Sequence, residues 1–458
     1  MTTNDTNDTA DVVVIGMGPG GEDAAGRLAE AGLDVIGIDH ELVGGECPYW
    51  GCIPSKMMIR AAHLLAEARR IPDMAGRAEV TPDWAPVAQR IRDEATTDWD
   101  DTIAVERFEG KGGRFVRGRG QITGPGQVTV GDQVITARRG IVVATGTTAA
   151  IPPIPGLDHV DYWTNRGAIS TKELPGSLIV LGSGAIGVEL AQAFARFGVE
   201  ATVVEALDRL VPLEEPEVGD ALAEVFADEQ IGVRVGARAT AVSTSGNGVR
   251  VELEGGETLE AERLLVATGR TADLGAVGLG AVGVDEGERW VPVDDHQRVT
   301  DGVWAVGDIT GKGAFTHVAL YQSAIAAAEI LGEDHEPASY HALPRATFTD
   351  PEIGSVGQTE EGAREAGIDV AVGMAKVPHT ARGWIHKAGN EGVIKLVADR
   401  QRQVLVGATA MGPNGGEVLG LLTVAVHAQV PVASLRQMIY AYPTFHKGIE
   451  DALRDLDL

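Results

Sequence analysis

The sequence has few cysteines and few aromatic residues. Only two of its 458 residues are cysteine, and aromatic side chains make up 5% of the chain. A chain of this length buries enough apolar surface to fold without disulfide bridges that hold it together. The two cysteines, which stand five positions apart, are therefore expected to have a redox or metal-binding role.

Basic residues are also scarce, with 38 against 66 acidic residues and a net charge of −28. This charge repels nucleic acids and anionic membrane surfaces, so we expect neither as a partner. The first ten residues, MTTNDTNDTA, lack the cationic and apolar regions of a signal peptide. No run approaches the ~18 apolar residues of a membrane helix. We therefore expect a cytoplasmic protein.

Glycine, by contrast, is abundant, with 60 residues. The apolar run DVVVI predicts a buried strand and leads into a G-x-G-x-x-G turn formed by Gly16, Gly18 and Gly21. A helical pattern follows, and then a second strand that ends at Asp39. Such a turn brings the backbone close to a pyrophosphate at the helix N-terminus, while the acid accepts hydrogen bonds from a ribose.

The same pattern occurs a second time, with Gly182, Gly184, Gly187 and a strand that ends at Glu205. In both copies the acid lies 18 residues after the third glycine. One such turn is weak evidence, but two matched copies in full context predict two dinucleotide sites. Glu205 can bind the 2′-hydroxyl of NAD and repel the extra phosphate of NADP, so we expect NADH to be preferred. Arg209 opposes this preference, because a nearby cation could accommodate that phosphate.

The two cysteines lie between these turns, in GGECPYWGCIPSK, just before a strongly helical pattern. Positions i and i+5 of a regular helix point about 140° apart, so Pro48 and Gly51 predict an irregular turn that lets Cys47 and Cys52 meet. A helix N-terminus lowers a thiol pKa, and Lys56 follows one turn beyond Cys52. Two thiols without a nearby histidine or second cysteine pair do not complete a zinc site. The sequence thus predicts a redox pair and no metal, with inert core cysteines as the alternative.

Taken together, these motifs resemble the class I pyridine nucleotide-disulfide oxidoreductases, which include dihydrolipoyl dehydrogenase, glutathione and mycothione reductases, and mercuric reductase. GGECPYWGCIPSK is similar to their active-site signature, and the resemblance covers nearly the whole chain. The other matching segments are VVATGTTA (142–149), LLVATGR (264–270), VWAVGDIT (303–310), FTDPEIGSVGQTE (348–360) and AYPTFHKGIED (441–451).

The resemblance implies FAD and NAD(P) as cofactors and roles for individual residues. Cys47 would attack the substrate, and Cys52 would lie against the flavin. Lys56 would sit near the flavin and pair with Glu189, since a lysine in a dry site needs a partner charge. The remaining expected cofactor contacts are Gly45, Gly120, Thr145, Gly146, Gly269, Gly307, Asp308 at the ribityl chain, and Thr316, whose helix would direct its N-terminus at the flavin.

The chain departs from the family at its end. Disulfide reductases usually close with His-Pro-Thr-x-x-Glu, and the partner subunit supplies this histidine as acid and base. Here Tyr442 and Lys447 occupy the histidine and glutamate positions. A tyrosine phenol ionises only at about pH 10 and is a poor base at neutral pH. His446 is a second candidate for the acid–base role.

We therefore expect an α/β protein with two Rossmann-like dinucleotide-binding domains and a C-terminal α/β interface domain. The predicted segments are 1–153 and 271–345 for FAD, 154–270 for NAD(P), and 346–458 for a dimer interface that completes each site. The leading hypothesis is an NAD(P)H-dependent reductase of a small disulfide or other thiol-reactive acceptor. The alternatives are a diaphorase, quinone reductase or transhydrogenase that works at the flavin, and a redox-sensing flavoprotein with little turnover.

Overall fold

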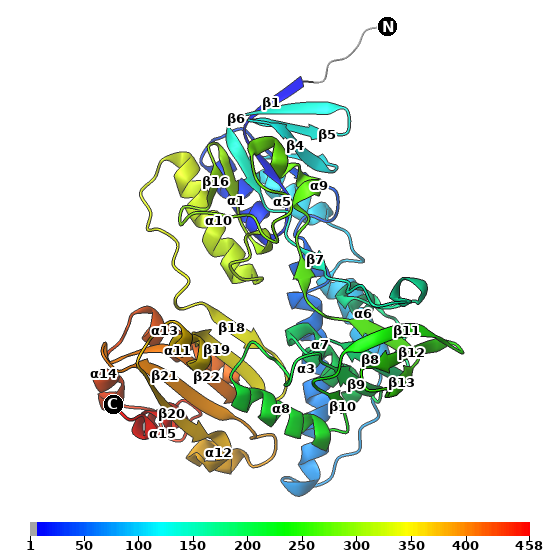
Figure 1. Ribbon diagram of the computed structural model, residues 1–458, viewed down its shortest axis with the longest axis vertical. Helices are drawn as coiled ribbons and strands as arrows, with labels where there is room; N and C mark the ends of the chain where they lie inside the picture. The colour runs from blue at the N-terminus through cyan, green and yellow to red at the C-terminus, as the bar shows by residue number, and fades with distance from the viewer. Residues whose placement is uncertain (1–6) are drawn as a thin grey trace. The chain divides into compact units, whose positions relative to one another are not determined.

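The computed structural model describes residues 7–458 (Figure 1). The chain divides into two compact units, each assembled from three separate stretches. The first contains the residues up to Pro54, Gln89–Ala150 and Arg270–Ser339; the second contains Ser55–Ala88, Ile151–Gly269 and Tyr340–Leu458. Each unit is described by itself below.

The first unit is built on a mainly parallel sheet in the order β16-β17-β6-β1-β2-β3. Its strands are β1 (Asn7–Ile15), β2 (Val35–Asp39), β3 (Arg114–Arg117), β6 (Gln133–Val143), β16 (Arg298–Thr300) and β17 (Val303–Ala305). The hairpin β4 (Gly120–Gly124) and β5 (Gln127–Val130) extends from β6.

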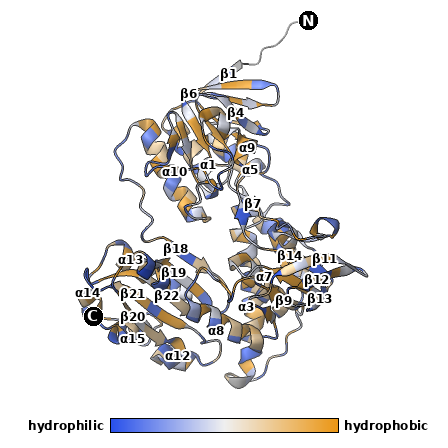
Figure 2. Cartoon of the chain, in the orientation of Figure 1, coloured by the Kyte–Doolittle hydropathy of each residue, from blue (hydrophilic) through white to orange (hydrophobic). Residues whose placement is uncertain are grey.

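Helices and strands cover both faces of this sheet, so β1 is apolar from Val12 to Ile15. Val12 and Val14 pack against α1 (Pro19–Glu30) and α10 (Thr316–Leu331). Val13 and Ile15 pack on the other face with the β4–β5 hairpin and α9 (Leu274–Val277). Alternate side chains of a strand point to opposite faces, which explains why DVVVI is a continuous apolar run. In Figure 2 the strands of this sheet contain stretches of orange, the colour of hydrophobic residues.

The second unit contains another parallel sheet, in the order β10-β9-β8-β14. It comprises β8 (Ser177–Leu181), β9 (Glu200–Val204), β10 (Gly232–Arg234) and β14 (Arg263–Val266). A three-stranded antiparallel sheet packs on it, formed by β11 (Ala239–Ser245), β12 (Gly248–Leu253) and β13 (Thr258–Ala261). Its helices include α3 (Cys52–Arg70), which starts in the first unit, α7 (Ala185–Arg196) and α8 (Pro216–Asp228).

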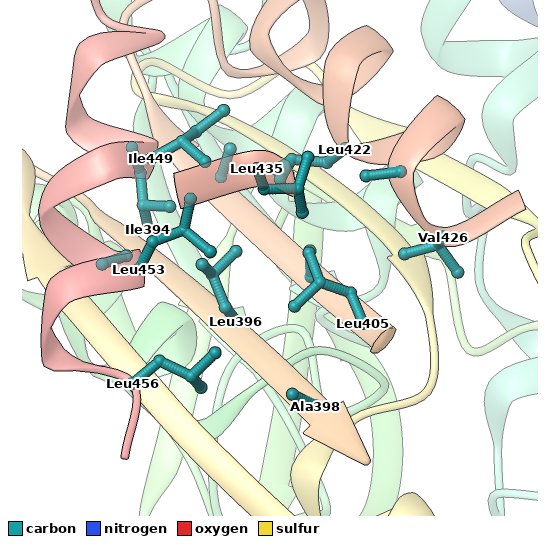
Figure 3. Close-up of a cluster of buried hydrophobic side chains, with 14 of the residues drawn as sticks. Ile394, Leu396, Ala398, Leu405, Leu422, Val426, Leu435, Ile449, Leu453 and Leu456 are labelled. Atoms are coloured by element: carbon teal, nitrogen blue, oxygen red, sulfur yellow. The ribbon is translucent and has the colours of Figure 1, made fainter. Parts of the chain in front are cut away.

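The C-terminal part of the second unit is a five-stranded antiparallel sheet in the order β18-β19-β22-β21-β20. The strands are β18 (Pro344–Thr347), β19 (Glu352–Gly357), β20 (Val370–Lys376), β21 (Val393–Asp399) and β22 (Val404–Gly412). Leu396 and Leu405 of this sheet form a core with Leu422 of α13 (Gly415–His427) and Leu453 of α15 (Lys447–Asp455) (Figure 3).

Both predicted strand–turn–helix–strand patterns are present, and the α/β class with two dinucleotide-binding folds and a C-terminal α/β domain is confirmed. Among the helices of residues 7–458, none combines the length and the hydropathy that crossing a bilayer requires.

Candidate active site

The first glycine turn brings several backbone segments into close contact. Gly16 has a φ of +93°, and a Cβ on it would lie 2.5 Å from the Ala144 carbonyl oxygen. Gly45, at φ +65°, approaches Gly18 so closely that a Cβ on Gly45 would lie 2.8 Å from the Gly18 Cα. These approaches bring three backbone segments together at the N-terminus of α1. This cradle fits the pyrophosphate of a dinucleotide.

The carboxylate of Asp39 fixes this turn from the end of β2. Its Oδ2 accepts a hydrogen bond from the Met17 N–H at 2.7 Å, and its Oδ1 accepts one from the Glu41 N–H at 2.8 Å. Asp39 therefore ties the end of β2 to the glycine turn, in addition to its predicted contact with a ribose.

The second glycine turn repeats this arrangement in the second unit. Glu205 Oε2 accepts hydrogen bonds from the Ser183 N–H at 2.9 Å and the Ser183 hydroxyl at 2.8 Å. Glu205 is buried, and its other oxygen accepts a hydrogen bond from the Leu207 N–H at 2.9 Å. A Cβ on Gly187 would collide with the Gly182 carbonyl oxygen, while one on Gly184 would point into open space among the described residues.

The two cysteines lie on either side of a break between helices. Cys47 belongs to the short helix α2 (Glu46–Tyr49), and Cys52 begins α3. Gly51 lies in the break, where a Cβ would come within 3.0 Å of the Glu46 carbonyl oxygen. The irregular turn brings the Cys47 and Cys52 side chains close enough for each thiol to affect the ionisation of the other. Cys52 Sγ also lies 3.5 Å from the Thr316 Oγ1 at the start of α10.

The electrostatics of Cys47 differ from the expectation for a thiol near a helix N-terminus. The pKa of Cys47 is raised, first by its hydrogen bond with Cys52 and then by burial, while Thr316 lowers it. Two adjacent thiolates repel each other, so the pair holds on to a proton.

Lys56 and Glu189 form an ion pair in the second unit. Lys56 Nζ lies 2.7 Å from Glu189 Oε2, and Glu189 is 5% exposed. The other carboxylate oxygen accepts a hydrogen bond from the Phe348 N–H at 2.7 Å, and Lys56 Nζ lies 4.7 Å from the Phe348 ring centroid. Phe348 was not predicted to take part in the site, although it opens the FTDPE motif.

Asp308 belongs to a polar cluster in the first unit. The Thr147 hydroxyl donates to Asp308 Oδ2 at 3.0 Å, and Arg270 Nε donates to Thr147 Oγ1 at 2.7 Å. Burial raises the pKa of Asp308. Thr147 and Arg270 were not predicted, yet each immediately follows one of the two ATG turns. The Gly307 N–H donates to Gln322 Oε1 at 2.7 Å, which ties this turn to α10.

The remaining predicted glycine and threonine residues lie in different surroundings. Gly146 and Gly269 have φ values of +65° and +121°, with open space where a Cβ would stand among the described residues. Thr145 is exposed in the first ATG turn. Gly120 is buried on β4, where a Cβ would lie 3.0 Å from Ile15 and 3.2 Å from Ile38. Packing accounts for this glycine, and its contact with a cofactor stays a prediction.

The closing motif lies at the start of α15 in the second unit. Tyr442 is 71% exposed, and His446 is the N-cap residue of α15. Lys447 forms an ion pair with Glu450, which also pairs with Arg454 at 2.6 Å. The glutamate position of the usual motif is thus filled by a lysine with a partner of its own, and the roles of Tyr442 and His446 stay predictions.

A cavity of about 490 Å³ in the first unit reaches Cys47 and Thr316. Its lining carries charges of both signs, from Arg107 and Lys111 and from Glu22, Asp23 and Asp100, beside the apolar surface of Tyr49 and Ile103. The segment Thr97–Trp99 beside it has three successive left-handed residues, with φ values of 50°, 57° and 58°. Strained backbone of this kind is concentrated at functional sites.

Two dinucleotide turns and a dithiol at a helix start define a nucleotide-dependent redox protein, and comparisons with known proteins name its family. Residues 10–328 match the pyridine nucleotide-disulphide oxidoreductase model, and residues 343–453 match the dimerisation domain of the same family. The chain therefore belongs to the pyridine nucleotide-disulphide oxidoreductases. It is a flavoprotein oxidoreductase of the FAD-dependent type, and its dimerisation domain supports a homodimer.

Relatives of this chain are named for different activities. A dihydrolipoyl dehydrogenase from Chlorobaculum tepidum is 36% identical, with 97% of this chain and 96% of the relative covered. A mercuric reductase from Bacillus cereus is 31% identical, with 98% and 71% covered. Among solved structures, LpdA from Mycobacterium tuberculosis has a TM-score of 0.85 at 28% identity, with 98% and 99% covered. The Cu(II) complex of the HOCl-induced flavoprotein disulfide reductase RclA from Escherichia coli has a TM-score of 0.84 at 27% identity, with 98% and 99% covered.

Proposed function

We propose that this flavoprotein uses NADH to reduce a small disulfide or another thiol-reactive acceptor, such as a metal ion, through Cys47 and Cys52. The observation that carries the proposal is the placement of the two thiols on either side of one helix break, beside a cavity that reaches Cys47. FAD, when bound, supplies the two-electron transfer between the nicotinamide and the dithiol. The cradle of Gly16, Gly18 and Gly45 fits its pyrophosphate, and Asp308 fits a hydroxylated chain.

The exchange reaction follows from the positions of the two thiols. The Cys47 sulfur forms a bond with one sulfur of a disulfide acceptor, and the other acceptor sulfur takes up a proton and leaves as a thiol. Cys52 then attacks the Cys47 sulfur, which forms the Cys47–Cys52 disulfide and releases the second thiol. The dithiol loses two electrons and two protons, and the acceptor gains both.

The closing motif supports reduction as the favoured direction. Oxidation of a dithiol substrate needs a base that removes a thiol proton, and Tyr442 with Lys447 does not provide the usual histidine–glutamate pair. A phenol that keeps its proton can still donate one to a leaving thiolate. We further propose that the closing motif of a second subunit completes each acceptor site in a cytoplasmic homodimer.

Two similar proteins support metal ions as acceptors. One relative is named a mercuric reductase, and one structural neighbour is a Cu(II) complex of a disulfide reductase. A thiolate pair is a soft ligand set that suits such ions. Any ion that accepts electrons here is a substrate.

Tyr442 and Lys447 replace the histidine and glutamate of the family's usual closing motif. This replacement favours a second candidate function, a diaphorase or transhydrogenase that works at the flavin. In that case a quinone or a second nucleotide takes the electrons and the dithiol is accessory. The two candidates predict different effects of removing Cys47.

The proposal is tested by an acceptor screen on the holoenzyme and two single variants. Lipoamide, glutathione disulfide, mycothiol disulfide, mercuric and cupric ions, and quinones are offered with NADH. Cys47→Ser is expected to lose disulfide and metal-ion reduction while NADH still reduces the flavin. Cys52→Ser retains the attacking thiol and is expected to accumulate a mixed disulfide on Cys47, which mass spectrometry detects. Full activity of Cys47→Ser with every acceptor would overturn the proposal in favour of chemistry at the flavin.

A further inference from the structure

A cluster of two histidines and one glutamate lies in the first unit, away from the dithiol. His296 precedes β16, Glu329 lies in the last turns of α10, and His335 follows the end of that helix. Glu329 Oε1 lies 3.2 Å from His296 Nδ1 and 3.0 Å from His335 Nε2. The side chains are 39%, 18% and 13% exposed for His296, Glu329 and His335. Glu329 comes 13 residues after Thr316 on the helix, which corresponds to about 20 Å.

The outer nitrogen of each ring faces an oxygen atom. His335 Nδ1 lies 3.0 Å from the Glu336 carbonyl oxygen, and His296 Nε2 lies 3.5 Å from the Asp295 carboxylate. A neutral imidazole carries one proton, and these oxygens favour it on the outer nitrogen. Metal-binding histidines are held by acceptors of this kind.

The inner nitrogens face the same carboxylate oxygen, and His335 Nε2 lies at hydrogen-bond distance from it, 3.0 Å from Glu329 Oε1. Arg298 donates to Glu329 Oε2 at 2.7 Å, so Oε1 is the oxygen directed at the rings. His296 Nδ1 is buried and has no hydrogen-bond partner in the described part of the chain. When both inner nitrogens are unprotonated, three electron-pair donors converge, and a metal ion can take the place of the protons between them.

The spacing matches a zinc ion. Bonds of 2.0–2.1 Å in a tetrahedron place neighbouring ligand atoms about 3.4 Å apart. The two measured separations are 3.0 and 3.2 Å, and all the ligand atoms of the cluster lie within 4.8 Å of one another. We propose that His296, Glu329 and His335 bind Zn²⁺ or a similar divalent transition metal, with water in the fourth position.

Such an ion would fasten the segment that leaves α10. The Ala338 N–H donates to the Asp295 carbonyl at 2.7 Å, and the Ser339 N–H donates to the Tyr321 hydroxyl at 2.9 Å. These bonds already attach the residues after His335 to the same loop and helix. The metal adds a third link just before the second unit resumes at Tyr340, so its role is structural and separate from the reaction at the dithiol.

The test uses FAD-loaded protein with the Cys47→Ser and Cys52→Ser substitutions, which remove the competing thiols. Co²⁺ serves as the spectroscopic probe and Zn²⁺ as the competitor in titration calorimetry, with one ion per chain expected. Asp295→Asn is expected to weaken binding roughly 10–100-fold, and His296→Gln or His335→Gln to weaken it further. The matched control is His159→Gln, because the His159 side chain is 82% exposed; this variant should bind as the parent does.

Hydrogen exchange supplies a second readout. In the protein with only the two cysteine substitutions, Zn²⁺ should slow hydrogen exchange at residues 333–339. When His335→Gln is added, Zn²⁺ should leave exchange at these residues unchanged. If the cysteine-free protein binds no ion, or if both histidine variants bind as tightly as the parent, the proposal is overturned and protons hold the three side chains together. Because the dithiol is absent from every variant, these outcomes do not bear on the proposed reductase function.

Discussion

The Lys56 ammonium lies 2.7 Å from the Glu189 carboxylate, which is 5% exposed, while Lys56 itself is 36% exposed. Lys56→Met would leave the Glu189 charge buried without its partner. We expect a loss of about 2 kcal/mol in unfolding free energy, below the ~3–5 kcal/mol of a fully buried pair because solvent screens the lysine. Flavin reduction by NADH should also slow in stopped-flow measurements.

The double variant with Glu189→Gln should regain part of the stability, and Lys172→Met on the surface is the control. Unchanged stability in Lys56→Met would refute this account.

The pKa of Cys47 gives a prediction about pH. Its largest cause of elevation is the hydrogen bond with Cys52, so Cys52→Ala should lower the pKa of Cys47. The thiolate is the reactive form; a raised pKa therefore means that alkylation of Cys47 by iodoacetamide accelerates as pH rises through the alkaline range. In Cys52→Ala that acceleration should begin at lower pH. Thr316→Val should shift it to higher pH, because Thr316 lowers the pKa. Identical pH profiles in the three proteins would contradict the coupling.

Cofactor choice should depend on Glu205. Its carboxylate is held by Ser183 at 2.8 and 2.9 Å, and Arg209 is engaged by Asp208 at 3.3 Å and by the Pro212 carbonyl at 3.1 Å. We expect a higher kcat/KM for NADH than for NADPH, and Glu205→Ala should reduce this preference at least about tenfold. Ser183→Ala is the matched control, because it removes the side-chain hydrogen bond and keeps the carboxylate. A wild-type preference for NADPH would show that a cation near the ribose outweighs Glu205.

Lys395 is the buried centre of a charge cluster. It is 3% exposed, and its Nζ lies 2.8–3.0 Å from Glu215, Glu217 and Glu360. Lys395→Met would leave buried Glu215 without a positive partner. We expect about 3–5 kcal/mol lower unfolding free energy in urea denaturation. Lys376→Met, at an exposed position on the neighbouring strand, should change it by less than about 0.5 kcal/mol. Equal stability of the two variants would show that Lys395 is dispensable.

Local sequence patterns predicted the parts of the molecule that depend on neighbouring residues. The apolar run ending at Ile15, the two glycine turns and the break at Gly51 each follow from backbone geometry within one short segment. The cluster of Thr147, Asp308 and Arg270 combines three distant segments. Its members follow recognisable turns, but their contacts depend on how the sheet brings those turns together.

Two other features were beyond the reach of local patterns. The raised pKa of Cys47 depends on a partner thiol and on burial, and both of these outweigh the helix N-terminus that the sequence suggested. The cluster of His296, Glu329 and His335 has no characteristic ligand spacing along the chain. Only the fold of α10 against the loop before β16 brings these ligand atoms within 4.8 Å of one another.

Tyr442 supplies the sharpest test of the reaction direction. Its side chain is 71% exposed in the single chain, at the position where the family usually has histidine. A phenol hydroxyl can donate a proton to a leaving thiolate, but it lacks the basic ring nitrogen with which a histidine takes a proton from a thiol. We expect slow dihydrolipoamide oxidation and faster reduction of activated disulfides, quinones or metal ions. Tyr442→Phe should slow acceptor reduction by up to about 10²-fold and leave flavin reduction by NADH unchanged, whereas His446→Gln should affect neither. Rapid dihydrolipoamide oxidation that disappears in His446→Gln would identify His446 as the base. It would also refute the role of Tyr442 as the residue that sets the direction of the reaction.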